Sequence, residues 1–193
     1  MQAFQDFGVS ALLVALAEMG DRTQLLTILL ATRFRRPLPI IAGVALATLA
    51  NHALAALAGY YVSSFLDALW FRYLIGASFL VMAVWVLIPD KAADEGGKVS
   101  HRGVFLTTLI AFFLVEMGDK TQIATAALAA RFSSVWIVTA GTTTGMLLAN
   151  VPAAYFGHAI TRIVPLVAMR YISAAVYALL GVASLLETAG YLD

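Results

Sequence analysis

The stretch EMGDRTQLLTILLATRF at residues 18–34 decides how this sequence is interpreted, because it occurs twice. Residues 116–132 read EMGDKTQIATAALAARF, and 11 of the 17 aligned positions are identical. Chance would give about one or two identities in such a window, so we interpret the match as an internal duplication. The same offset of 98 residues aligns Gly43 with Gly141.

The composition outside the duplicated stretch is that of a membrane protein. Of the 193 residues, 62% are hydrophobic and 12% are charged, against roughly 45–50% and about 25% in an average soluble domain. The apolar residues suffice for six spans of roughly 20 residues each. A soluble domain of this size could not bury so many in one core. A net charge of +1 and the lack of cysteine further disfavour nucleic-acid binding, disulfides and thiol chemistry.

Six apolar stretches predict an all-α polytopic membrane protein with six transmembrane helices. The polar segment 90–102 divides the chain into a first three-helix repeat, 1–89, and a second, 103–193. Because three is an odd number, the second repeat must enter the membrane from the opposite side, which makes an inverted-topology repeat. The N-terminus has no basic region or cleavage site, so we expect a retained helix there rather than a signal peptide. The stretches cover 4–31, 38–63, 69–89, 104–130, 135–158 and 165–187.

The distribution of basic residues supports this inversion and predicts an orientation. With the loops assigned alternately, eight Lys and Arg residues fall on one side and two, Arg72 and Arg131, on the other. The positive-inside rule then places the 90–102 linker in the cytoplasm and both termini outside it. Arg72 and its counterpart Arg170 fall on opposite sides, as inversion requires.

Each copy of the motif places three charged residues inside an apolar stretch. A charge at bilayer depth costs about 2.5–3.5 kcal/mol on insertion scales, so we expect these charges to face a polar cavity and one another. Glu18 and Asp21 share one helix face, and Arg22 can partly neutralise the pair. Gly20 allows either a close backbone approach or a local break that frees a carbonyl oxygen.

The two motifs together suit a divalent cation. If the duplication brings them to a pseudo-two-fold axis, four carboxylates and two bases meet with a net charge of −2. Oxygen ligands favour Ca²⁺, Mn²⁺ or Mg²⁺ over Zn²⁺ or Cu⁺. A thioether from Met19 or Met117 would favour Mn²⁺, but packing against neighbouring helices is the expected role of both. The predicted metal ligands are Glu18, Asp21, Glu116 and Asp119, supported by Arg22, Lys120, Thr23, Thr121, Gln24, Gln122, Asn51 and Asn150.

Two further polar positions in the second and fifth apolar stretches bear on the site. With a one-residue slip, Asn51 aligns with Asn150. These two residues either complete the shell of the ion or hydrogen-bond between helices. His52 has no partner in the second copy at that slip, and a satisfied buried or cavity-lining histidine is favoured over a ligand.

Two copies of E-x-G-D-[KR]-[TS] in a six-span chain of this size resemble the Gdt-type cation/proton antiporter family. That family includes bacterial manganese exporters and the Golgi calcium/manganese transporters of eukaryotes. Residues 18–23, EMGDRT, and 116–121, EMGDKT, are complete matches. The resemblance implies export of Mn²⁺ or Ca²⁺ from the cytoplasm in exchange for protons, with the motif acids as ion ligands. The short chain resembles prokaryotic or organellar forms, and we expect a bacterial inner membrane.

Antiport also follows from the chemistry of the carboxylates. Four acids at close quarters cannot all stay ionised without a cation, so metal and protons exclude each other, and rocking halves convert this into exchange. The main alternative is an exporter of small solutes such as amino acids, which would have a larger cavity and a charge pair for the solute. An intramembrane enzyme is disfavoured, since no HExxH or Ser/His/Asp pattern is present. The expected partners are divalent ions and the lipid bilayer, with no resident cofactor and no nucleic acid; homo-oligomerisation is left open.

Overall fold

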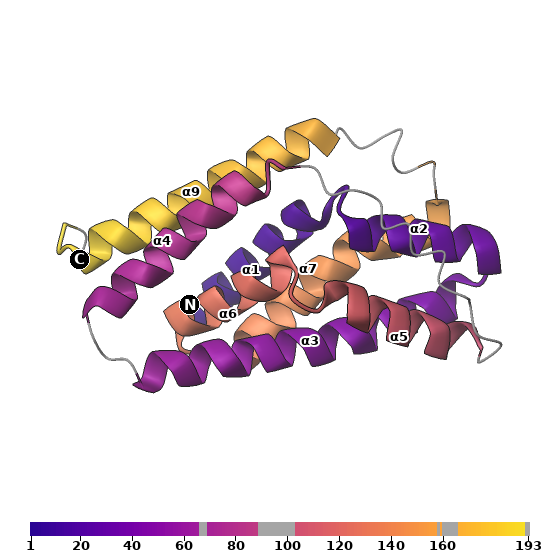
Figure 1. The fold of residues 1–193 in the computed structure, drawn as a ribbon, viewed down its shortest axis with the longest axis horizontal. Helices are drawn as coiled ribbons and strands as arrows, with labels where there is room; N and C mark the ends of the chain where they lie inside the picture. The colour runs from indigo at the N-terminus through magenta and orange to yellow at the C-terminus, as the bar shows by residue number, and fades with distance from the viewer. Residues whose placement is uncertain (66–68, 89–102, 158, 160–165, 192–193) are drawn as a thin grey trace.

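The computed structural model describes residues 1–65, 69–88, 103–157, 159 and 166–191, and all regular structure in these ranges is helical (Figure 1). The predicted all-α class is therefore confirmed. The predicted linker, 90–102, lies outside the described residues. The helices are α1 (Gln2–Glu18), α2 (Arg22–Phe34), α3 (Pro37–Phe65), α4 (Leu69–Trp85), α5 (Val104–Glu116), α6 (Lys120–Phe132), α7 (Val135–Phe156) and α9 (Leu166–Thr188).

Two of the described helices are long and apolar enough to cross a membrane, over Pro37–Ser63 in α3 and Val167–Thr188 in α9. Helices α1 and α2 would form a third span together, but they are bent by 68° relative to each other. Helices α4 and α5 are apolar and shorter. The predicted stretches 4–31 and 104–130 are each divided between two helices, so the described helices do not by themselves reproduce six continuous spans.

Both divisions fall at the duplicated motif. Helices α1 and α5 end at the glutamate of each motif, and α2 and α6 begin at its basic residue. Between them, Gly20 and Gly118 have φ angles of +82° and +77°, a backbone conformation that glycine adopts without the steric penalty of a Cβ atom. Of the two roles that the sequence left open for Gly20, the structure shows the helix break.

The two halves of the chain pack against each other reciprocally. Helix α1 packs mainly on α7, α3 packs on α5, α6 and α7, and α4 lies along α9 (Figure 1). A Cβ atom on Gly43 of α3 would lie 2.9 Å from the carbonyl oxygen of Phe105 in α5. A Cβ atom on Gly141 of α7 would lie 2.7 Å from that of Phe7 in α1. The 98-residue offset of the sequence thus recurs in helix contacts that only glycine permits.

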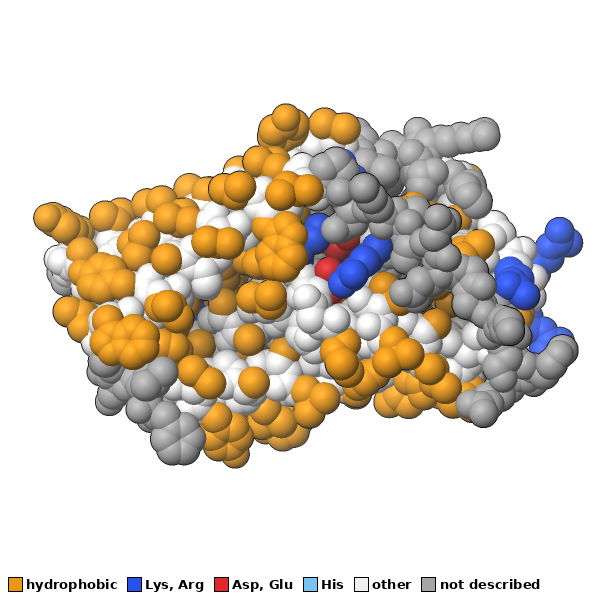
Figure 2. All heavy atoms as spheres, in the orientation of Figure 1, with side chains coloured by type: hydrophobic (Ala, Val, Ile, Leu, Met, Phe, Trp, Pro, Cys, Tyr) orange, Lys and Arg blue, Asp and Glu red, His pale blue; other side chains and the backbone are white. Residues whose placement is uncertain are grey.

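The molecule is apolar on its outside. The side chains of Leu12, Leu54, Trp136 and Leu179 are more than half exposed, and hydrophobic atoms dominate the face drawn in Figure 2. Acidic and basic side chains gather in one opening near the middle of that face. Such a surface suits contact with lipid, with the polar groups turned toward the protein interior.

Candidate functional site

The acidic residues of both motifs are buried in the centre of the helix bundle. Glu18 and Glu116 are fully buried, and Asp21, Asp119 and Lys120 are nearly so. Burying ionised groups is costly unless they are paired with opposite charges or bind a metal ion. The arrangement of their partners therefore indicates what the site can bind.

The basic residue of each motif pairs with the aspartate of the other motif. The Arg22 Nη2 atom donates to Asp119 Oδ1 at 2.9 Å, and Lys120 Nζ lies 3.7 Å from Asp21 Oδ1. The sequence predicted that Arg22 neutralises the acids of its own motif, and this was wrong, because its side chain reaches across the break to the other half. The crossing brings together two motifs that lie 98 residues apart.

The backbone at each break explains the aspartate and the glutamine of the motif. Asp21 and Asp119 are the N-caps of α2 and α6, where the helix N-terminus stabilises a carboxylate. The Gly20 and Gly118 N–H groups donate to Gln24 Oε1 at 2.8 Å and to the Oε1 atom of Gln122 at 2.6 Å. The two glutamines were predicted to support the ion site. In the structure their side-chain oxygens accept hydrogen bonds from the backbone at the two helix breaks.

The Glu18 carboxylate lies among the other three acids without a hydrogen bond of its own. Neither of its oxygens accepts one from a described residue. The charges that act on it belong to Asp21, Asp119 and Glu116, and the Asn150 side chain lies beside it. These three acids repel the Glu18 carboxylate when they are ionised, and a cation placed beside it would relieve that repulsion.

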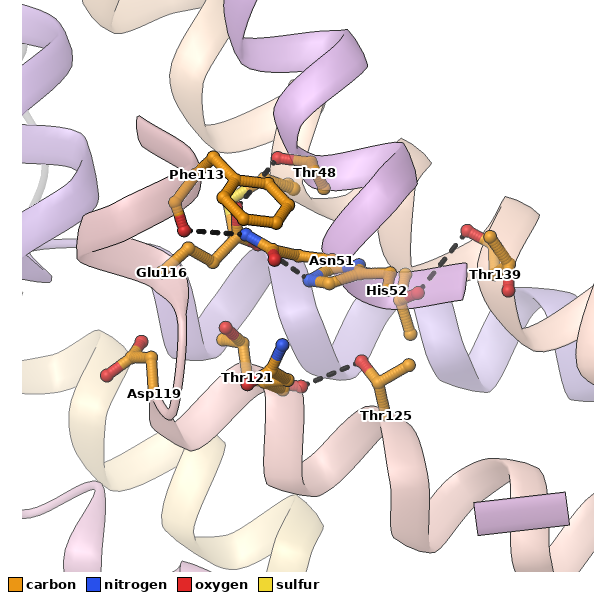
Figure 3. A network of polar contacts seen from close by, with 12 residues as sticks. Thr48, Asn51, His52, Phe113, Glu116, Asp119, Thr121, Thr125 and Thr139 are labelled. Atoms are coloured by element: carbon orange, nitrogen blue, oxygen red, sulfur yellow. Dashed lines mark hydrogen bonds and ion pairs between the residues drawn. The ribbon is translucent and has the colours of Figure 1, made fainter. Parts of the chain in front are cut away.

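Glu116 has a different environment, which α3 supplies (Figure 3). His52 Nε2 lies 2.8 Å from its Oε1 atom, and the Thr48 hydroxyl donates to Oε2 at 3.3 Å. Asn51 Nδ2 donates to the carbonyl oxygen of Phe113 at 3.0 Å, while its Oδ1 atom accepts no hydrogen bond from a described residue. His52 is fully buried, as predicted. The expectation of a histidine with satisfied hydrogen bonds was wrong, because neither ring nitrogen makes one with a described residue, and its position against a motif carboxylate was not predicted.

Asn150 makes one hydrogen bond between helices and one within its own helix, α7. Its Oδ1 atom accepts from the Thr27 hydroxyl at 2.7 Å, and its Nδ2 atom donates to the carbonyl oxygen of Met146 at 3.1 Å. Of the two roles that the sequence left open for Asn51 and Asn150, the structure favours hydrogen bonding between helices, with the Oδ1 atom of Asn51 the exception.

The remaining predicted residues divide into buried and peripheral ones. The hydroxyls of Thr23 and Thr121 are buried and make no hydrogen bond with a described residue, so both remain available to a ligand. Met117 is 52% exposed and Met19 is partly buried. The exposure of Met117 argues against its thioether as a ligand of an ion bound among the buried acids.

Tyr177 of α9 is a residue that the sequence analysis missed. It is 1% exposed, and its hydroxyl makes no hydrogen bond with a described residue. The charges that act on it belong to Asp119, Asp21 and Glu18. The duplication did not point to it either, because the 98-residue offset aligns Tyr177 with Phe79, which has no hydroxyl.

Within the described part of the chain, no group of three or more His, Asp or Glu side chains is arranged to hold a metal ion. In this arrangement the aspartates are paired with the protein's own cations, Arg22 and Lys120. The structure therefore shows buried acidic residues whose two aspartates are paired with the basic residues of the opposite motifs.

Comparison with known proteins identifies one matching family and two similar proteins. The model of the family described as "Divalent cation/proton antiporter GDT1" matches residues 6–94 and 104–191. A Vibrio cholerae serotype O1 protein named "Putative manganese exporter" is 48% identical over 178 residues, covering 91% of this chain and 88% of that protein. The Synechocystis protein "GDT1-like protein sll0615" is 30% identical over 172 residues, covering 78% and 82%. No solved structure matches the chain significantly.

Proposed function

This chain belongs to the GDT1 family of divalent cation/proton antiporters, and from that membership we propose that it exports Mn²⁺, Ca²⁺ or both from the cytoplasm in exchange for protons. The family is one of membrane transporters, not of enzymes. The observation that carries the proposal is the meeting of the two EMGD[RK]T motifs through crossed ion pairs in the protein interior.

The transported ion binds the four motif acids, Glu18, Asp21, Glu116 and Asp119. These acids with Arg22 and Lys120 carry a net charge of −2, which one divalent cation neutralises. To reach the aspartates the ion displaces the two basic side chains, which return when it leaves. The crossed pairs thus act as internal counter-charges for the empty site.

Protons compete with the ion for the same carboxylates, because a carboxylate must lose its proton to bind a metal. Ion and protons then occupy the site in turn, and exchange follows when the site opens alternately to each side. This mutual exclusion needs no ionisable residue outside the motifs.

We also infer that six spans form two inverted three-helix repeats, 1–89 and 103–193, joined by a cytoplasmic linker at 90–102. In this scheme two of the spans are discontinuous, one formed by α1 and α2 and the other by α5 and α6. Their helix ends point at the ion, as in many transporters. The reciprocal helix contacts at the 98-residue offset support the scheme. In the proposed orientation both termini lie outside the cytoplasm of a bacterial inner membrane, and the charge bias of the loops supports this orientation.

Export of small organic solutes is the second candidate, and one observation favours it. A cavity of about 460 Å³ lies away from the motifs and is lined by Arg72, Arg131 and Glu187 among others. It offers both signs of charge to a solute with charged ends. Stabilisation of the purified protein by divalent ions would favour ion transport, and stabilisation by amino acids alone would favour this alternative.

The test is exchange in proteoliposomes with an imposed pH gradient and competing Mn²⁺, Ca²⁺ and Mg²⁺. Glu18→Gln or Asp119→Asn is expected to abolish ion-driven proton movement. Glu187→Gln is the matched control, because this carboxylate pairs with Arg131 and is half exposed. Normal exchange by either motif variant would refute the assignment of the site.

A further inference from the structure

One of the differences between the two halves of the ion site lies beside the motif glutamates. At the strict offset of 98 residues, His52 corresponds to Asn150, as Glu116 corresponds to Glu18. The structure preserves this correspondence, because Asn150 lies beside Glu18 and His52 lies against Glu116. The half of the site that contains Glu116 therefore has an imidazole where the other half has an amide.

The contact between His52 and Glu116 is close but is not a well-formed hydrogen bond. The Nε2 and Oε1 atoms are 2.8 Å apart, yet neither atom has a hydrogen-bond partner of acceptable geometry among the described residues. Two ligands on adjacent corners of an octahedron, each about 2.1 Å from a metal ion, lie about 3.0 Å apart. The separation of the two atoms thus suits joint coordination of one ion.

Other buried polar atoms without partners lie in the same region. The Oδ1 atom of Asn51 and the Oγ1 atom of Thr121 make no hydrogen bond with a described residue. Figure 3 shows Asn51 next to His52 and Glu116, with Thr121 on the neighbouring helix segment. A buried polar atom that lacks a partner costs free energy in the absence of a ligand. Oxygen atoms of these two types would complete a mixed nitrogen and oxygen ligand set.

We propose that the imidazole of His52 is a ligand of the transported ion and that it makes the site prefer Mn²⁺ to Ca²⁺. Imidazole suits divalent transition metals, whereas Ca²⁺ takes oxygen ligands almost exclusively. This inference rests on the proposed function and adds to it a selectivity residue outside the duplicated motif.

The test uses the purified full chain with less than one equivalent of Mn²⁺ and pulsed electron paramagnetic resonance, which detects a nitrogen atom bonded to Mn²⁺. The parent chain is expected to show this nitrogen signal, and His52→Asn, which copies the amide of the other half, is expected to lose it. His101→Asn, in the predicted linker, is the matched control and should keep it. Isotope-labelled histidine in the parent chain should change the signal, and that measurement needs no variant.

Ion competition in proteoliposomes gives an independent measurement. Loss of a residue that only orients a ligand typically lowers metal affinity by 10–100-fold, so His52→Asn should lower the preference for Mn²⁺ over Ca²⁺ by at least about tenfold. Two results would refute the role of His52 without refuting the proposed function. One is Mn²⁺ exchange by a parent chain that shows no nitrogen signal, and the other is an unchanged preference for Mn²⁺ over Ca²⁺ in His52→Asn. No divalent exchange by the parent chain would refute the proposed function as well.

Discussion

Lys120 is the residue whose replacement best tests whether the ion displaces the crossed ion pairs. Its Nζ atom lies 3.7 Å from Asp21 Oδ1, and both side chains are less than one tenth exposed. At an effective dielectric constant of about 20, two unit charges at this distance attract by about 4.5 kcal/mol. Lys120→Met removes the charge while keeping much of the apolar stem. The variant leaves the Asp21 charge buried without this partner, so we expect the free energy of unfolding to fall by about 3–5 kcal/mol.

The assay is thermal unfolding of the purified protein in detergent, with and without Mn²⁺. Without metal, Lys120→Met should unfold at a clearly lower temperature than the parent. With Mn²⁺, most of the difference should disappear, because the ion supplies the missing positive charge and no longer competes with lysine. The metal-induced rise in the unfolding temperature should therefore be larger in the variant than in the parent.

Two controls separate this effect from general damage. Lys120→Arg keeps the charge and should behave like the parent. Arg131→Met breaks an ion pair at 2.9 Å in which Glu187 is half exposed, and such a pair contributes only about 0–1 kcal/mol. It should show no special response to Mn²⁺. A Lys120→Met protein that Mn²⁺ stabilises no more than it stabilises the parent would refute competition between lysine and the ion.

Three further predictions concern packing, an unpaired hydroxyl and pH. Gly141→Ala places a methyl group 2.7 Å from the Phe7 carbonyl oxygen. We expect it to destabilise the protein by about 1–3 kcal/mol, measured by thermal unfolding. An unchanged unfolding temperature would contradict the close helix contact. Tyr177→Phe should leave the free energy of unfolding nearly unchanged, since the lost hydroxyl has no described partner. The same variant should bind Mn²⁺ more weakly in titration calorimetry. An unchanged affinity would show that the hydroxyl has no part in the site. Stabilisation by Mn²⁺ should grow from mildly acidic to neutral pH, because the ligating carboxylates must release protons, and it should be lost in a variant combining Asp21→Asn with Asp119→Asn. A pH-independent effect would argue against a shared site.

Much of this molecule follows from the sequence because its signals are strong ones. An apolar helical chain is evident from composition, and buried charges in a duplicated motif point to the site. The break at Gly20 was one of two outcomes that the sequence allowed. It could not be chosen without knowing that the Gly20 N–H group finds a partner in Gln24 Oε1.

Other features depend on the relative placement of the halves. Arg22 was assigned to its own motif because neighbours along a helix are the contacts that spacing can predict. Its pairing with Asp119 needs the second half in place. The sequence analysis aligned Asn51 with Asn150 by a one-residue slip, because the two residues are identical. At the strict 98-residue offset, Asn150 corresponds to His52 instead, and the slip hid this correspondence. Tyr177 resembled other aromatic residues of the spans and carried no local signal.

The crossed ion pairs have a consequence for biosynthesis. Arg22 is made 97 residues before Asp119, its partner, so a growing chain that contains only the first half holds charged groups whose partners do not yet exist. We therefore expect stable insertion of the first half to depend on the second half. Residues 1–89 produced alone should be degraded, and production of 103–193 in the same cell should restore them.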